Sequence, residues 1–159
     1  MNLVQFAKHM EGLGHGIERN AQKLKVDIAI EVLSVVARST PADTGLARTN
    51  WITTVGQPTS RKIPSPAYPG EQLGMNELMN AQWAIGQGQM ALLVPGAATG
   101  RNIYIQNNQP YIGLLNRGRS LQAGGGFVER AVLKGIVIAL GRKLVPDSSG
   151  GVITSGIHP

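Results

Sequence analysis

Apolar residues recur at steps of three and four positions along the first quarter of the chain. This spacing places them on one face of a helix, so the pattern predicts a helix over residues 3–38. Three glycines fall within residues 12–16, and each costs up to about 1 kcal/mol inside a helix, so we expect a break there. The residue before a proline is pushed toward extended conformations. The helix should therefore end at residues 39–40, ahead of Pro41.

Two later stretches favour β-structure. Residues 46–55 contain Trp51 and a run of β-branched residues, which predicts a strand. Residues 102–106 alternate, with Ile103 and Ile105 on one face and the intervening tyrosine on the other, as in a short strand.

Helical composition returns at residues 75–90, with Asn76 as a candidate cap, and again at residues 127–143. Between these helices, residues 92–94 fit either a short strand or a loop. Residues 111–115 fit either an extended segment or a single turn.

Proline marks the irregular parts of the chain. Residues 56–74 contain four prolines, which forbid both a regular helix and a central strand, so they form an extended Pro-rich arm or a long loop. Pro146 ends the last helix, and residues 146–159 have little to bury, which predicts a flexible C-terminal tail. The sequence thus predicts a single domain over residues 1–145.

Composition narrows the class of protein. Aromatic residues are only 4% of the 159 residues, so the core must be aliphatic. Glycine is abundant at 21 residues, while charged residues reach only 15%. Such a surface is typical of a subunit that is covered in an assembly rather than of a free monomer. Cysteine is absent, which excludes disulfides and thiolate metal sites and fits a cytoplasmic protein. No apolar run approaches the roughly 20 residues that span a bilayer, and the N-terminus lacks a signal-peptide pattern.

The positive charge of the chain is concentrated in its second half. The formal net charge is +6, and residues 101–143 alone supply an excess of that size. A basic half indicates nucleic acid, an acidic protein partner or the rim of a channel through which DNA passes. Aromatic stacking platforms are missing among these bases, so any DNA contact should be non-specific. The candidate DNA-channel or inter-subunit contacts are Arg117, Arg119, Arg101, Arg61 and Lys62.

The sequence offers no convincing catalytic site. His9, His15 and His158 lack Cys or carboxylate neighbours at metal-ligand spacing. Asp43 begins a D-T-G triplet like that of aspartic proteases, but a helix end and a proline precede it instead of an apolar strand. The glycine clusters lack the Lys-Ser/Thr of a phosphate loop, and no G-x-S-x-G elbow is present. We therefore expect no enzyme activity, no cofactor and no metal.

Two short motifs remain, in a fixed order. The first motif is the segment 40–51, and the second motif is the segment 107–128. The residues that define the first motif are Pro41, Asp43, Thr44, Gly45, Leu46, Arg48, Asn50 and Trp51. Those of the second are Asn107, Pro110, Tyr111, Leu115, Gly118, Gly126, Phe127 and Val128.

Taken together, the two motifs resemble those of the small head–tail joining (neck or tail-completion) proteins of tailed bacteriophages, over residues 3–143. Two features depart from that pattern, namely the Pro-rich arm and the bases Arg117 and Arg119 around Gly118. The resemblance implies an α+β fold, with a long N-terminal helix and a C-terminal helix packed on a small antiparallel β-sheet. We expect Trp51 and Tyr111 to be substantially buried between the sheet and the helices and to hold the two motifs together.

The resemblance further implies a function. The protein would be a virion component assembled in the host cytoplasm, forming a homo-oligomeric ring of 6 or 12 copies in the neck. Its partners would be portal-side connector proteins, tail terminator or tail tube proteins, and genomic DNA that passes through non-specifically, with no membrane. Three alternatives stay open: a tail terminator or minor tail protein that caps the tail tube, a basic DNA-binding accessory protein, and a small hydrolase.

Overall fold

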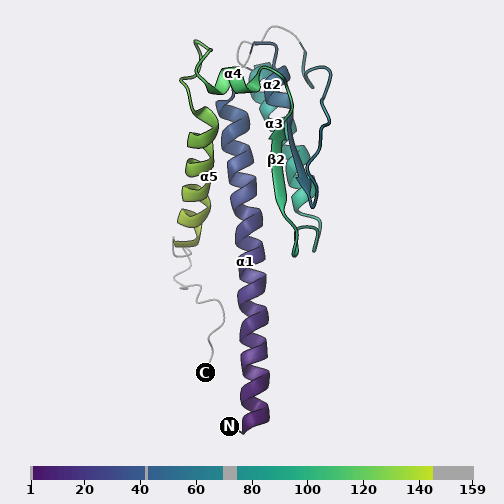
Figure 1. Ribbon diagram of the computed structural model, residues 1–159, viewed down its shortest axis with the longest axis vertical. Helices are drawn as coiled ribbons and strands as arrows, with labels where there is room; N and C mark the ends of the chain where they lie inside the picture. The colour runs from purple at the N-terminus through teal and green to yellow at the C-terminus, as the bar shows by residue number, and fades with distance from the viewer. Residues whose placement is uncertain (1, 42, 70–74, 145–159) are drawn as a thin grey trace.

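The computed structural model describes residues 2–41, 43–69 and 75–144, and they form an α+β fold (Figure 1). The elements in chain order are α1 (Leu3–Ser39), α2 (Leu46–Thr49), β1 (Trp51–Val55), α3 (Met75–Leu92), β2 (Ile103–Asn107), α4 (Ile112–Asn116) and α5 (Phe127–Leu144). A long N-terminal helix, a C-terminal helix and a small antiparallel sheet are therefore present, as the resemblance implies.

Helix α1 runs unbroken through its three glycines, so the predicted break at residues 12–16 is wrong. Its first turn is closed by a capping box in which Asn2 and Gln5 exchange hydrogen bonds of 2.9 Å. The glycines lie in the exposed first half, between the capping box and a second half that packs against the rest of the molecule, so they weaken the continuous helix without interrupting it. The predicted end is confirmed at Ser39, where the Thr40 hydroxyl donates to the carbonyl of Val36 at 2.7 Å.

The sheet has two antiparallel strands, with Trp51 opposite Asn107 and Val55 opposite Ile103. The predicted strand at residues 102–106 is confirmed within one residue. The predicted strand at residues 46–55 is wrong in its first half, where Leu46–Thr49 is one helical turn. Gly45 starts this turn with a φ of +80°, and its carbonyl accepts from the backbone N–H of Thr49. Four residues are too few for the helical period to be visible in the sequence.

Helix α1 forms the centre of the core, with α5 on one side and the sheet with α3 on the other (Figure 1). The core is mostly aliphatic, and Trp51 and Phe127 are its aromatic members. Gly88 of α3 and Gly135 of α5 permit the closest approaches of these helices to α1. A Cβ at Gly88 would meet Leu33 of α1 at 2.2 Å, and a Cβ at Gly135 would meet the backbone of Val32 at 2.6 Å. The predicted helices at residues 75–90 and 127–143 are confirmed.

The described part of the Pro-rich arm, residues 56–69, has no regular secondary structure and follows the body of the protein. Gln106 of β2 makes two hydrogen bonds to the backbone of Thr59, at 2.8 and 3.2 Å. Asn108 donates to the carbonyls of Thr59 and Arg61, both at 2.9 Å. Residues 70–74 of the arm and the predicted tail from residue 146 lie outside the described residues.

Three smaller predictions are settled by the helix bounds. Asn76 is the second residue of α3 and does not cap it. Leu92 ends α3, and residues 93–94 continue as a turn rather than a strand. Of the two alternatives for residues 111–115, the single turn holds, because Ile112–Asn116 is the short helix α4.

Candidate functional site

The two motifs meet in space at one end of the molecule, where α1 ends (Figure 1). Trp51 of the first motif and Asn107 of the second are partners in the sheet register. The Asn107 side chain donates to the carbonyl of Ala47 at 2.7 Å, which ties α2 to the end of β2. The two motifs, which are separate along the chain, are therefore in direct contact in the folded protein.

Trp51 joins this contact to α1. Its side chain is only 6% exposed, and its Nε1 donates to the Thr40 hydroxyl at 2.7 Å. That hydroxyl in turn donates to the carbonyl of Val36. The indole N–H and the hydroxyl are both buried and both satisfied, so the pair fixes the end of α1 against β1 at little desolvation cost.

A second buried polar group fastens the arm to the first motif. The Asn50 side chain donates to the carbonyl of Ile63 at 3.0 Å and accepts from its N–H at 2.7 Å. The Thr49 hydroxyl donates to Asn80 of α3 at 2.9 Å. Asn80 also accepts from and donates to the backbone of Tyr68. These amides replace the backbone partners that a Pro-rich segment cannot find in a sheet.

Arg48 is placed between elements rather than toward a ligand. Its Nε donates to the carbonyl of Thr40 at 2.7 Å, and its guanidinium lies 3.3 Å from the Glu77 carboxylate. Burial lowers the pKa of the Arg48 guanidinium from its ordinary value, while the Glu77 charge opposes that change. Its role is to hold the end of α1 against α3.

The glycines of the second motif close the loop between α4 and α5. Gly118 and Gly126 have φ of +87° and +76°, which favour glycine, and a Cβ at Gly118 would lie 3.0 Å from the backbone of Gly125. Asn116 accepts from the N–H of Val128 at 2.9 Å and donates to both oxygens of Glu129 at 3.0 Å. The Asn116 hydrogen bonds hold the pKa of the exposed Glu129 carboxyl below its usual value.

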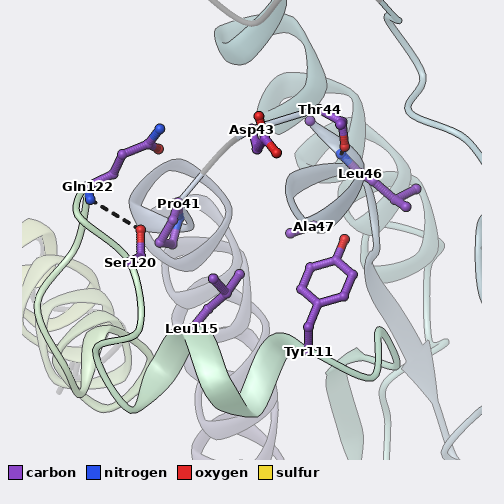
Figure 2. Close-up of a pocket in the computed structure, with 10 residues that line it drawn as sticks. Pro41, Asp43, Thr44, Leu46, Ala47, Tyr111, Leu115, Ser120 and Gln122 are labelled. Carbon is purple, nitrogen blue, oxygen red and sulfur yellow. Dashed lines mark hydrogen bonds between the residues drawn. The ribbon is translucent and has the colours of Figure 1, made fainter.

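A cavity of about 440 Å³ lies where the two motifs face each other (Figure 2). The first motif contributes the stretch from Asp43 to Ala47, and the second contributes Tyr111 and Leu115. Tyr111 is half-buried rather than fully buried, and its ring points toward the first motif. Burial raises the pKa of the Tyr111 hydroxyl above its ordinary 10.0, and the Asp43 charge adds to that effect. Pro110, by contrast, lies in the exposed turn before α4.

The candidate basic contacts do not form one patch. All five are exposed: Arg61, Lys62, Arg101, Arg117 and Arg119. Arg101 precedes β2 and packs its Cδ 3.8 Å from where a Cβ of Gly56 would be. Arg61 lies at the opposite end of β2, beside Asn108, and Arg117 and Arg119 follow α4. The sequence therefore predicted the exposure of these bases but not their separation.

The part of the chain that the structure describes contains neither a candidate metal site nor a helix that could span a membrane. Among those residues, no group of three or more His, Asp or Glu side chains could hold a metal ion. His9 and His15 are exposed on α1. The Nε2 atom of His15 lies 3.9 Å from the Glu11 carboxylate, one helical turn earlier. His158 lies outside the described residues. Over the same described ranges, no helix has the length and apolarity to cross a bilayer.

Some residues that hold this region together were not among those singled out from the sequence, although Thr40 and Asn116 lie within the two motifs. Thr40, Asn80 and Asn116 each bridge two elements. A polar Asn80 inside the apolar positions of α3 was a usable signal, since it is fully buried there. The hydrogen bonds from Trp51 to Thr40 and from Val128 to Asn116 span 11 and 12 residues, so no helical or strand period marks these two side chains.

Comparison with known proteins returned no match. No protein-family model, no curated protein and no solved structure matches this chain.

Proposed function

We propose that this chain is a structural virion protein of a tailed phage, which forms a ring in the neck between the DNA-filled head and the tail. The observation that carries the proposal is the use made of the two motifs. Trp51, Asn50, Arg48 and Asn107 all have partners inside their own chain, across elements. Motifs that align a strand pair with two helices support a mechanical role better than a catalytic one.

The low surface charge and the exposed apolar residues support the same proposal. Exposed large apolar side chains extend over α1 and α5, and a free monomer gains nothing from exposing them in water. Repetition of one interface around an axis covers such surfaces and closes a ring. A role as a tail terminator or minor tail protein would use the same kind of ring and differs only in its place in the particle.

The direct test is whether phage particles need the protein. In an infection that lacks it, we expect filled heads and finished tails to accumulate unjoined, and the added wild-type chain to restore infectious particles. Normal particles in its absence would refute the neck role. Joined particles whose tails have abnormal length would instead indicate the terminator alternative.

The second candidate, a basic DNA-binding accessory protein, is supported by the exposed pair Arg117 and Arg119. It predicts micromolar binding to duplex DNA that weakens steeply with salt. The double variant Arg117→Glu, Arg119→Glu should then lose most of that binding. The neck proposal predicts instead that the variant stays folded and fails in head–tail joining, because these bases face passing DNA or a neighbouring carboxylate.

A further inference from the structure

The first half of α1 projects beyond the rest of the molecule (Figure 1). Residues 2–24 are exposed apart from a few half-buried positions, although large apolar side chains recur there at steps of three and four. Within residues 3–24 these are Leu3, Phe6, Met10, Leu13, Ile17 and Leu24, which we call the α1 stripe. Ile17 is 70% exposed. With Ala21 in the gap between Ile17 and Leu24, the steps average 3.5 residues, which is the pattern of a helix that packs along another helix.

The α1 stripe continues a surface that already binds a helix. At 100° per residue, Ile28, Val32 and Val35 fall on the same face of α1 as the stripe. In the second half of α1 that face is covered by α5, whose Gly135 lies against the backbone of Val32. No described residue continues this cover along the projecting half. The α1 stripe is therefore the uncovered, N-terminal part of a face that binds α5 in the second half of α1.

Helix α5 has a matching uncovered face. The side that packs on α1 includes Phe127, Ala131 and Ala139, which are all buried. The opposite side carries Leu133, Val137 and Leu140, and the first two of these are 66% and 69% exposed. A helix that is apolar on both sides is typically covered on both sides. We call this second side the outer α5 face.

We propose that the α1 stripe of one copy packs antiparallel along the outer α5 face of a second copy. The two faces match over part of their length: Leu133 to Leu140 spans about 10 Å, a third of the roughly 31 Å of the α1 stripe, so the contact covers the stripe around Leu13 and Ile17. Their shapes also agree. Ala7, Gly14 and Ala21 lie along one side of the stripe, and such small side chains let a partner helix approach closely.

Charges at the edges of the two faces favour the antiparallel orientation. Glu11 and Glu18 flank the α1 stripe on one edge, and Lys134 flanks the outer α5 face on the corresponding edge. Antiparallel helices bring corresponding edges together, so Glu18 meets Lys134 and Ile17 falls within about one turn of Val137. Antiparallel pairing of two α1 stripes would instead place acidic edges together, and pairing of two stripes in either orientation would leave the outer α5 face exposed.

This contact deepens the proposed function, and its biological meaning rests on that function. The two faces belong to different parts of the chain, so the contact is head-to-tail; such a contact closes a ring or extends an open filament, according to the rotation between neighbouring copies. The contact cannot form within one chain. Ile17 lies fifteen residues before Val32, or about 22 Å along α1, and Val32 is the residue that packs at Gly135 of α5.

The chain has no cysteine, so engineered cysteines give an unambiguous test. The full chain is prepared as Ile17→Cys, as Val137→Cys and as the double variant, and each is oxidised at low concentration. We expect disulfide-linked dimers when the two single variants are mixed, and a ladder of multimers from the double variant. Val4→Cys replaces Ile17→Cys as the control, because Val4 is also exposed but lies off the stripe.

Three results would overturn the proposal: efficient dimers of Ile17→Cys alone, no linkage in the mixture, or equal linkage with the Val4→Cys control. A second measurement needs no cross-link. Ile17→Asp and Leu133→Asp should each abolish the higher-mass species in sedimentation, with helix content unchanged, whereas Val4→Asp should not. Cross-linking without any ring would refute the neck proposal alone, and rings without the cross-link would refute this contact alone.

Discussion

At the scale of single residues, hydrogen-bonding side chains connect separate segments of this protein, which has few aromatic residues to fill that role. Asn50, Asn80 and Asn107 each join backbone segments that are distant in the sequence. The sequence motifs pointed to Asn50 and Asn107, but their partners are set by the tertiary fold. The types of residue at this site were therefore predictable, while the network they form was not.

Trp51 gives the clearest stability prediction at this scale. We expect Trp51→Ala to lower the free energy of unfolding by about 3 kcal/mol or more, because a large buried side chain leaves a cavity. Trp51→Phe should cost less, since it keeps most of the volume and loses only the hydrogen bond to Thr40. Denaturant unfolding of the isolated subunit measures both. A loss well under 1 kcal/mol for Trp51→Ala would mean that the ring serves an interface instead.

Tyr111 gives a prediction for alkaline pH. The pKa of the Tyr111 hydroxyl in the folded protein lies above 10.0, so the protonated hydroxyl favours the folded state. This contribution to stability is complete below pH 10 and is lost as pH rises through the pKa of the folded state. In an absorbance titration at 295 nm, Tyr111→Phe should remove a tyrosine that ionises above pH 10. Asp43→Asn should lower that pKa only in part, because burial is the larger cause. A Tyr111 that titrates at or below pH 10 would contradict this.

At the scale of elements, the long regular segments were predictable and the short ones were not. The helices α1, α3 and α5 and the strand β2 follow from apolar periodicity, and their ends were set by Pro41 and by polar turns. The first half of the 46–55 prediction failed because α2 is a single turn whose start depends on Gly45. The break at residues 12–16 failed because propensity is a weak term beside capping and packing.

Two glycines of α5 separate packing from propensity. Gly135→Ala should destabilise the fold by about 1–3 kcal/mol, because its Cβ would meet the Val32 backbone at 2.6 Å. Gly141→Ala, six residues later, has nothing within 4 Å of its Cβ and should stabilise by up to about 1 kcal/mol. Thermal or denaturant unfolding compares the pair. Stabilisation by both changes would show that α5 does not approach α1 this closely.

The arm gives a prediction about proteolysis. From sequence alone, the whole arm should be cleaved easily in a free subunit, since it cannot bury enough of itself. The hydrogen bonds of Asn50 to Ile63 revise this for the described part of the arm. We expect trypsin to cut slowly after Arg61 and Lys62 in the wild-type chain and several-fold faster in Asn50→Ala. Mass spectrometry measures the rate of cleavage. Equally fast cleavage of the wild-type chain and of Asn50→Ala would show that Asn50 does not fasten the arm.

At the scale of the whole molecule, the structure joins a packed body to a helix that extends far beyond it (Figure 1). The composition predicts a subunit of an assembly, and this stays a prediction; the structure locates the exposed apolar residues on α1 and α5. The place of these faces could not be read from the sequence, because an apolar stripe looks the same whether its own chain or a neighbour covers it.

The central claim is that this chain assembles with itself into a closed ring with an opening for DNA. Negative-stain electron microscopy of the purified full chain tests it most directly, with molar mass measured on the same sample. The account predicts annular particles of uniform size, at 6 or 12 times the 16.8 kDa chain mass, with a central opening. A single monomeric species at every concentration tried, or open filaments without closure, would contradict it.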